Sequence, residues 1–144
     1  MDTRRGVDLS KYRFERAEET LNAAINNLDN GFNNESATRS YYAIFYGMVA
    51  VTLLNGFNAS KHSSIISYFR KNYIKTKIFD DTLSDIICTA FEVRTEADYG
   101  EFYTVSNEEA QKQIDNAKIF LDTIRPYLEK CWAEMEEKIN ERNI

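Results

Sequence analysis

Apolar residues recur at three- and four-residue steps along most of the chain, and this spacing predicts helices. The first predicted helix covers roughly residues 9–29, and the Asn30-Gly31 pair after it is a typical left-handed stop. Its apolar face consists of Phe14, Ala17, Leu21, Ala24, Ile25 and Leu28. The second, from about Glu35 to Leu54, is apolar or aromatic on nearly every side. It is therefore expected at the centre of the fold, ending at Asn55-Gly56.

Two shorter helices are predicted in the middle of the chain. Ser60 is placed to cap the third. This helix should bury Ile65, Ile66, Phe69 and Tyr73 and turn out Arg70, Lys71 and Lys75. Asp80 or Asp81 should cap a fourth, which runs up to Arg94 before a break at Gly100. Its apolar repeat consists of Leu83, Ile86, Ile87, Ala90 and Phe91.

The last helix is predicted to begin at a capping box, Ser106 to Glu109, whose side chains can satisfy free backbone donors at a helix start. A heptad stripe follows, made of Ala110, Ile114, Ala117, Leu121, Ile124, Leu128, Cys131 and Met135. The stripe is expected first as core and second as a dimer seam. Pro126 removes one backbone hydrogen bond, so a kink or a restart is expected there. Residues 129–144 either extend as a helical arm or fray.

Glycine and proline are scarce, with five and one in 144 residues, and no segment keeps the alternating pattern of a strand. We therefore predict an all-α fold, an antiparallel bundle of four to five helices joined by short loops. The length suits one domain, residues 1–144.

The distribution of charged and apolar residues indicates where in the cell the protein is expected. The uncharged stretch from Ser40 to Ser60 is interrupted near its end by Asn55 and Gly56, so its apolar part is shorter than the roughly 20 residues that span a bilayer. The first 16 residues are too charged for a secretion signal, which favours a cytoplasmic protein without membrane contact. Cys88 and Cys131 are expected to be reduced packing residues.

Charge is distributed unevenly along the chain. The net charge is −5, yet no acid occurs from Ser36 to Phe79. That segment carries six bases: Arg39, Lys61, Arg70, Lys71, Lys75 and Lys77. The asymmetry predicts one basic surface that could bind nucleotide or RNA phosphates.

Several familiar site motifs are absent from the sequence. It contains no Gly-rich phosphate loop, no zinc-type Cys/His spacing and no Glu-x-x-His pair of a di-iron bundle. These absences argue against a metalloenzyme, and no cofactor is predicted. His62 is the single histidine, so it is the one side chain whose ordinary pKa lies near neutrality.

Arg94 continues the buried stripe of the fourth helix, so its guanidinium needs a partner. Asp98, one turn on, can supply it, either as an ordinary ion pair or as the carboxylate that holds a phosphate-binding arginine ready. Lys61 and His62 open the third helix, where an anion is favoured; otherwise Lys61 is solvated and His62 covers the helix end. Tyr41 and Tyr42 are expected in the core more than as base-stacking platforms.

These motifs together resemble one branch of the HEPN family (higher eukaryotes and prokaryotes nucleotide-binding). The shared pattern is R-S-Y-Y-A-x-F, present here from Arg39 to Phe45, then Lys61-His62, then R-x-x-x-D-Y, present as Arg94 to Tyr99. The resemblance spans roughly residues 14–128. It implies a helical bundle, usually dimeric and often encoded beside a minimal nucleotidyltransferase as a toxin and antitoxin pair.

The resemblance also implies two functions. Family ribonucleases use an arginine followed by a histidine, without metal, in a cleft between two copies. Arg94 matches the arginine, but Asp98-Tyr99 occupies the histidine's region, which leaves His62 and Tyr99 as candidate proton-transfer groups. One alternative is a non-catalytic module that docks the transferase and binds nucleotide or RNA through the basic third helix. Another is a purely structural dimeric bundle, in which the charge asymmetry is incidental. In related toxins the partner adds nucleotidyl groups to a tyrosine near the arginine motif; Tyr99 corresponds to it, with Tyr103 as the fallback acceptor.

Overall fold

The computed structural model describes residues 2–142 and contains helices but no strand within that range. The five α-helices are α1 (Thr3–Asp29), α2 (Asn33–Thr52), α3 (His62–Phe69), α4 (Thr82–Tyr99) and α5 (Asn107–Arg142). Two short turns accompany them, the 3-10 turn η1 (Leu53–Asn55) after α2 and the π-helical turn η2 (Arg70–Ile74) after α3. The predicted all-α bundle is confirmed.

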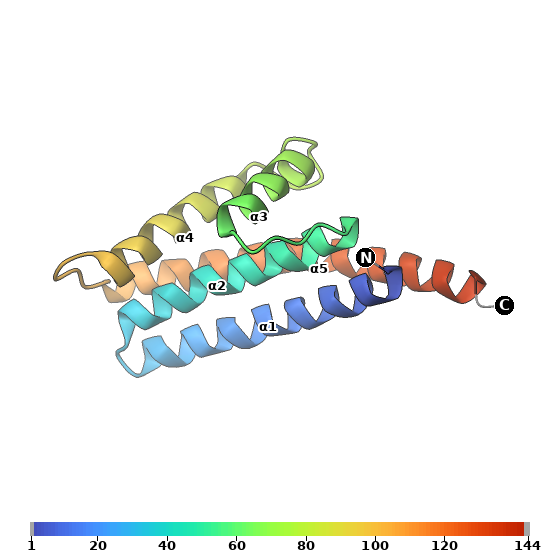
Figure 1. The fold of residues 1–144 in the computed structure, drawn as a ribbon. Helices are drawn as coiled ribbons and strands as arrows, with labels where there is room; N and C mark the ends of the chain where they lie inside the picture. Colours follow the sequence, from blue (N-terminus) through green and yellow to red (C-terminus); the bar gives the residue numbers. More distant parts are fainter. Residues whose placement is uncertain (1, 143–144) are drawn as a thin grey trace.

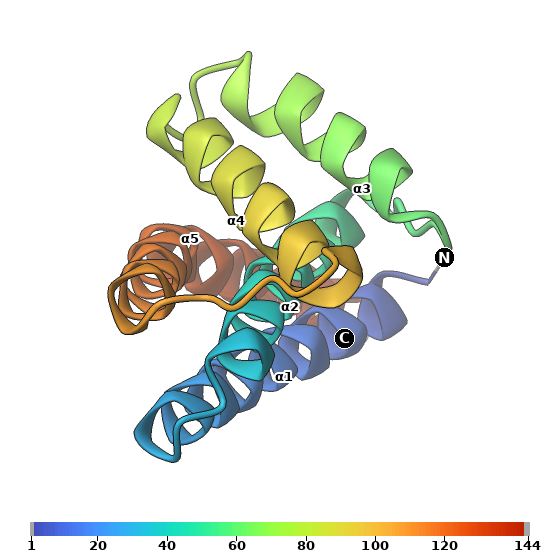
Figure 2. The ribbon, with the colours of Figure 1, turned by 90° about the vertical axis from the view of Figure 1, so that its left-hand side faces the viewer.

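The helices form two groups. In Figure 1, α1, α2 and α5 run side by side, and α3 and α4 form a hairpin that crosses over them. The end-on view in Figure 2 shows the hairpin lying above α2. Helix α2 contacts each of the other four α-helices, as its apolar circumference predicted.

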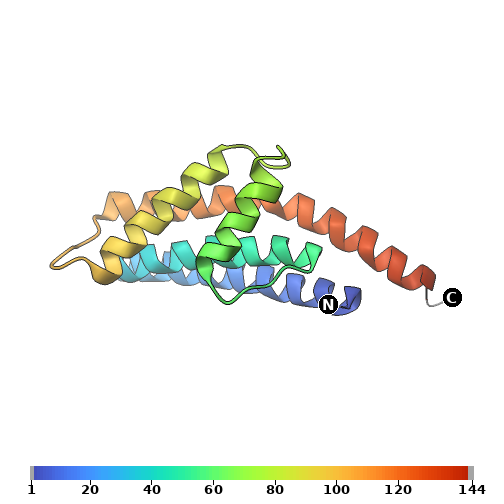
Figure 3. The same cartoon turned by 45° about the horizontal axis from the view of Figure 1, so that its top comes forward.

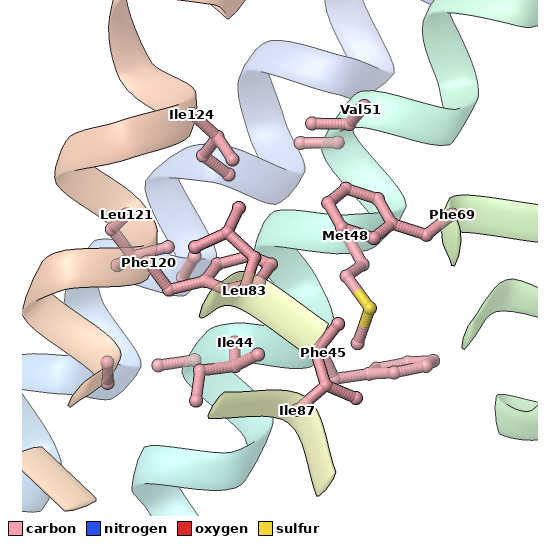
Figure 4. Close-up of a cluster of buried hydrophobic side chains, with 14 of the residues drawn as sticks. Ile44, Phe45, Met48, Val51, Phe69, Leu83, Ile87, Phe120, Leu121 and Ile124 are labelled. Atoms are coloured by element: carbon pink, nitrogen blue, oxygen red, sulfur yellow. The ribbon is translucent and has the colours of Figure 1, made fainter. Parts of the chain in front are cut away.

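The core is built around α2. Figure 4 shows side chains of four helices meeting there, among them Ile44, Met48, Phe69 and Leu121, each at most 1% exposed. Gly47 allows the close approach of α5, since a Cβ atom at that position would lie 2.9 Å from Leu121 Cδ2. Burial of this apolar surface is the main stabilising contribution to the fold.

Several predicted helix ends are corrected. Helix α1 begins at Thr3, six residues before the expected Leu9, with the Asp2 carboxylate accepting a hydrogen bond from the backbone N–H of Arg4 (3.4 Å). Ser60 does not cap α3, which starts at His62 after an extended Lys61 without a side-chain cap. The stops at Gly31 and Gly56 are confirmed by positive φ angles of 82° and 73°.

The start of α4 is held by Asp80, whose carboxylate accepts from the backbone N–H of Thr82 at 2.9 Å. Two residues of α4 predicted to lie inside are on the surface instead: Phe91 is 45% exposed and Cys88 is also exposed. Both side chains line an open groove between α3–η2 and α4, opposite Ile66 and Arg70. Cys131, the other predicted packing residue, is partly buried.

Helix α5 begins as predicted, with Ser106 Oγ accepting from the backbone N–H of Glu109 at 3.1 Å. The Glu109 carboxylate, however, accepts from the Tyr103 hydroxyl (2.9 Å), not from the backbone as a full capping box requires. The helix continues through Pro126 without a restart, and Figure 3 shows it bending along its length. The stripe from Ala110 to Leu128 is buried and is therefore core.

Residues 129–142 form a helical extension that docks against the start of α1. The Trp132 indole donates to Ser10 Oγ (2.8 Å), and Ser10 in turn donates to the carbonyl of Ala50 (2.6 Å). Lys11 and Glu136 form an ion pair beside them. These residues are helical as far as Arg142, and residues 143–144 lie outside the described range. None of the described helices is both long and apolar enough for a membrane span.

Candidate functional site

Arg94 lies in the last turns of α4 and is tied to both α4 and α2. Its Nε donates to Asp98 Oδ2 at 3.0 Å, and one terminal nitrogen donates to the Tyr42 hydroxyl at 3.2 Å. The Thr38 hydroxyl donates to the other oxygen of Asp98 at 2.7 Å. The predicted partner of Arg94 is thus confirmed, and the pair is held from a second helix.

Three tyrosine rings surround the Arg94 guanidinium. Its central carbon lies 5.3, 5.6 and 5.5 Å from the ring centroids of Tyr41, Tyr42 and Tyr99, within the range of cation–π attraction. Tyr41 is 1% exposed and Tyr99 is 73% exposed, so the guanidinium bridges the core and the surface. The side chain of Arg94 is 15% exposed, so only a small part of it reaches solvent.

His62 reaches the same cluster from the first turn of α3. Its ring stacks on Phe45 at 4.0 Å between centroids, and Nδ1 lies 3.1 Å from the Tyr41 hydroxyl. Burial lowers the pKa of His62, and the positive charge of Arg94 lowers it further. The imidazole is therefore neutral at neutral pH. Burial raises the pKa of Tyr41 to about 12, so this neighbour keeps its proton.

We call Thr38, Tyr41, Tyr42, His62, Arg94, Asp98 and Tyr99 the Arg94 cluster. The structure brings four predicted site residues into it: His62, Arg94, Asp98 and Tyr99. Sequence analysis missed the role of Thr38 and assigned Tyr42 to the core. The sequence feature that could have revealed their shared role is the spacing of four residues, which places Thr38 and Tyr42 on one face of α2.

The predicted basic residues do not join this cluster. Four of them, Arg70, Lys71, Lys75 and Lys77, lie around one hollow along η2 and the start of α4. Arg70 donates to Ser84 Oγ (3.2 Å) and to Cys88 Sγ (3.0 Å) in the groove between α3–η2 and α4. Lys71 lines the continuation of that groove, whereas Arg39 faces α1 beside Arg16. The predicted basic surface is therefore formed by the segment from Arg70 to Lys77, and Arg39 lies apart from it on α2. Lys61 is exposed at the start of α3.

Across residues 2–142, no three or more His, Cys, Asp or Glu side chains cluster closely enough to hold a metal ion. The groups available in the Arg94 cluster are a guanidinium, a neutral imidazole, a carboxylate and phenols. A guanidinium binds phosphate oxygens and stabilises developing negative charge, and a neutral imidazole accepts a proton.

Comparison with known proteins adds sequence relatives to this geometry. The sequence profile of the HEPN domain matches residues 10–127. A Methanocaldococcus jannaschii protein named "Putative toxin MJ0142" is 34% identical over 128 residues, covering 89% of this chain and 86% of that protein. A Thermotoga maritima protein named "UPF0332 protein" is 34% identical over 119 residues, covering 83% and 90%. An Archaeoglobus fulgidus protein of the same name is 27% identical over 124 residues, covering 86% and 98%.

Proposed function

Because the chain belongs to the HEPN domain family, we propose that it is a toxin that cleaves RNA as a homodimer without a metal ion. One observation carries the proposal: Arg94 of α4 and His62 of α3 contact the same two tyrosines, Tyr41 and Tyr42. A phosphate-binding group and a proton acceptor therefore stand side by side. The similarity to a protein named as a toxin supports the biological role.

The proposed reaction is attack of an RNA 2′-hydroxyl on the adjacent phosphorus, which breaks the bond to the 5′ oxygen. Neutral His62 takes the proton of the 2′-hydroxyl, in place of the histidine that the family motif lacks here. Arg94 holds the phosphate and stabilises the charge that develops on it, while Asp98 orients the guanidinium. The Tyr99 hydroxyl donates a proton to the departing 5′ oxygen.

The homodimer in this proposal is the arrangement that family resemblance implies. Exposed apolar side chains lie next to the cluster and supply a surface for a second copy: Phe91 is 45% exposed, and Phe102, just beyond α4, is 96% exposed. Pairing through this surface would bring the two copies of Arg94 toward one cleft.

The proposal is tested by cleavage of a short RNA in the presence of a chelator at a series of pH values. His62 acts in its neutral form, so the rate should reach a plateau near neutrality and fall as the pH drops through a midpoint below 6.5, the ordinary imidazole value. Since His62 is the single histidine, one imidazole NMR resonance reports its titration directly. No cleavage, or a midpoint that does not match the titration of His62, would contradict the proposal.

A second candidate function is favoured by the position of Tyr99. Here the chain is a binding module for a minimal nucleotidyltransferase, which adds a nucleotidyl group to Tyr99. The Tyr99 ring is 73% exposed and lies 5.5 Å from the Arg94 guanidinium, which can hold the phosphate of the incoming nucleotide. Tyr103 suits the role less, because its hydrogen bond to Glu109 raises the pKa of its hydroxyl.

Incubation with such a transferase and ATP is expected to add one nucleotidyl mass to the wild-type chain, and Tyr99→Phe should remove that adduct. Tyr103→Phe is the matched control and should leave the adduct in place. Intact-mass spectrometry measures both. An adduct that survives in Tyr99→Phe would exclude Tyr99 as the acceptor.

A further inference from the structure

A second group of arginines surrounds a hollow of about 220 Å³ between α1 and α2. Its lining consists of Arg16 and Thr20 from α1 with Thr38, Arg39, Tyr42 and Tyr46 from α2. We call it the Arg16–Arg39 hollow. It contains two guanidiniums and four hydroxyl groups, of which the Thr38 hydroxyl already donates to Asp98, and none of the described residues that line it is acidic. That composition suits an anion with several oxygens, such as a phosphate group.

The positive charge at this hollow is only partly neutralised. Arg16 donates to Glu19 at 3.0 Å, an exposed pair that solvent screens. Arg39 forms no ion pair with any residue from 2 to 142. Arg13 adds a third guanidinium nearby, since both Arg13 and Arg16 lie over the Tyr46 ring at 5.8 and 5.9 Å. An anion bound in the hollow would balance this charge.

The hollow and the Arg94 cluster share a wall. Tyr42 lines the hollow with its ring and accepts a hydrogen bond from Arg94 through its hydroxyl. Thr38 lines the hollow as well, and it donates to Asp98. The hollow and the Arg94 guanidinium therefore stand on either side of one pair of α2 side chains.

We propose that the Arg16–Arg39 hollow binds a phosphate of an RNA strand, next to the phosphate held at Arg94. This inference rests on the proposed function for the ligand at Arg94. Arg39 makes the main contact, because its guanidinium has no carboxylate partner to compete with a bidentate phosphate. Arg16 makes the second contact after releasing Glu19. The hollow thus fixes the register of the strand at the Arg94 cluster.

The test measures binding of a fluorescent, fully 2′-O-methylated oligoribonucleotide by anisotropy at several salt concentrations. This strand has no free 2′-hydroxyl and cannot be cleaved, so binding is read separately from catalysis. Arg39→Gln is expected to weaken binding about tenfold at low salt, the loss of one charge-assisted contact. It should also reduce the slope of log affinity against log salt by about one. Arg16→Gln should act in the same direction.

Lys118→Gln is the matched control, since Lys118 is an exposed base on α5 outside both places. It should change the affinity much less than Arg39→Gln. The inference is overturned if Arg39→Gln and Lys118→Gln have equal effects, or if the wild-type chain does not bind the strand. It is also overturned if Arg39→Gln weakens binding of adenosine monophosphate but not of the strand, because the ligand is then a free nucleotide.

The outcomes separate this inference from the proposed function. Binding that depends on Arg39, without any cleavage of unmodified RNA, would keep the hollow as a strand-binding place and remove the ribonuclease activity. Cleavage of unmodified RNA, together with an Arg39→Gln affinity for the methylated strand equal to that of wild type, would keep the ribonuclease activity and remove the hollow as a strand-binding place.

Discussion

Replacing Arg94 with glutamine is expected to reduce the rate of RNA cleavage by at least about 100-fold, the effect of removing one group that stabilises transition-state charge. Glutamine keeps a polar side chain of similar length, but it loses the positive charge and the two-point contact with Asp98 and Tyr42. The measurement is a single-turnover cleavage rate at saturating protein. Arg94→Lys should recover only part of the rate, since an ammonium lacks the planar fork of donors.

Arg125→Gln is the control for this experiment. Arg125 also pairs with carboxylates, at Asp122 and Glu18, but it lies on α5 away from the Arg94 cluster. Its replacement should leave the cleavage rate within a few-fold of wild type. Circular dichroism would show whether each variant keeps its helices. Cleavage by a folded Arg94→Gln at nearly the wild-type rate would reject the site.

Replacing Phe69 with alanine is expected to lower the free energy of unfolding by about 3–5 kcal/mol, a large part of the roughly 5–15 kcal/mol typical of a domain. Phe69 is 0% exposed and is the point where the α3–α4 hairpin meets the other helices. Its ring lies 5.6 Å from those of Tyr73 and Phe120, and 5.7 Å from that of Phe79. The alanine variant would leave a cavity between them.

Urea unfolding measures this loss, with Phe32→Ala as the matched control. Phe32 is 57% exposed, so the same truncation should cost about 0.5 kcal/mol or less. Equal losses in the two variants would show that Phe69 does not hold the hairpin in place.

The local spacing of apolar residues and glycines predicted the fold well wherever a single helix contains the whole pattern. The all-round apolarity of α2 predicted its central place, and the glycines at 31 and 56 predicted two stops. The family resemblance drawn from the segments at Arg39 and Arg94 is likewise confirmed. The first turns of α1 were missed because they hold few apolar residues and depend on contacts with α5. The exposure of Phe91 was missed for a similar reason, since helical spacing does not reveal how far a neighbour extends.

For the candidate site, sequence spacing predicted only contacts and positions that lie within one helix. Spacing by four residues on α4 predicted the contact between Arg94 and Asp98, and the position of His62 at a helix start made it a candidate. The contacts of Tyr42 and Thr38 join different helices, so no local pattern contains them. For the same reason the sequence did not reveal that Arg39 and Arg16 line one hollow, because they stand 23 positions apart in the sequence.

The contact between α1 and the C-terminal half of α5 contains a natural fluorescent probe. Trp132 is the single tryptophan, and its indole is tied to a buried serine hydroxyl of α1 while Phe14 lies 6.1 Å from its ring. Its fluorescence emission therefore reports whether the far half of α5 stays docked. In Figure 1 the start of α1, where this extension docks, and the C-terminal end of α4 lie toward opposite ends of the molecule, so the probe reports on docking away from the Arg94 cluster.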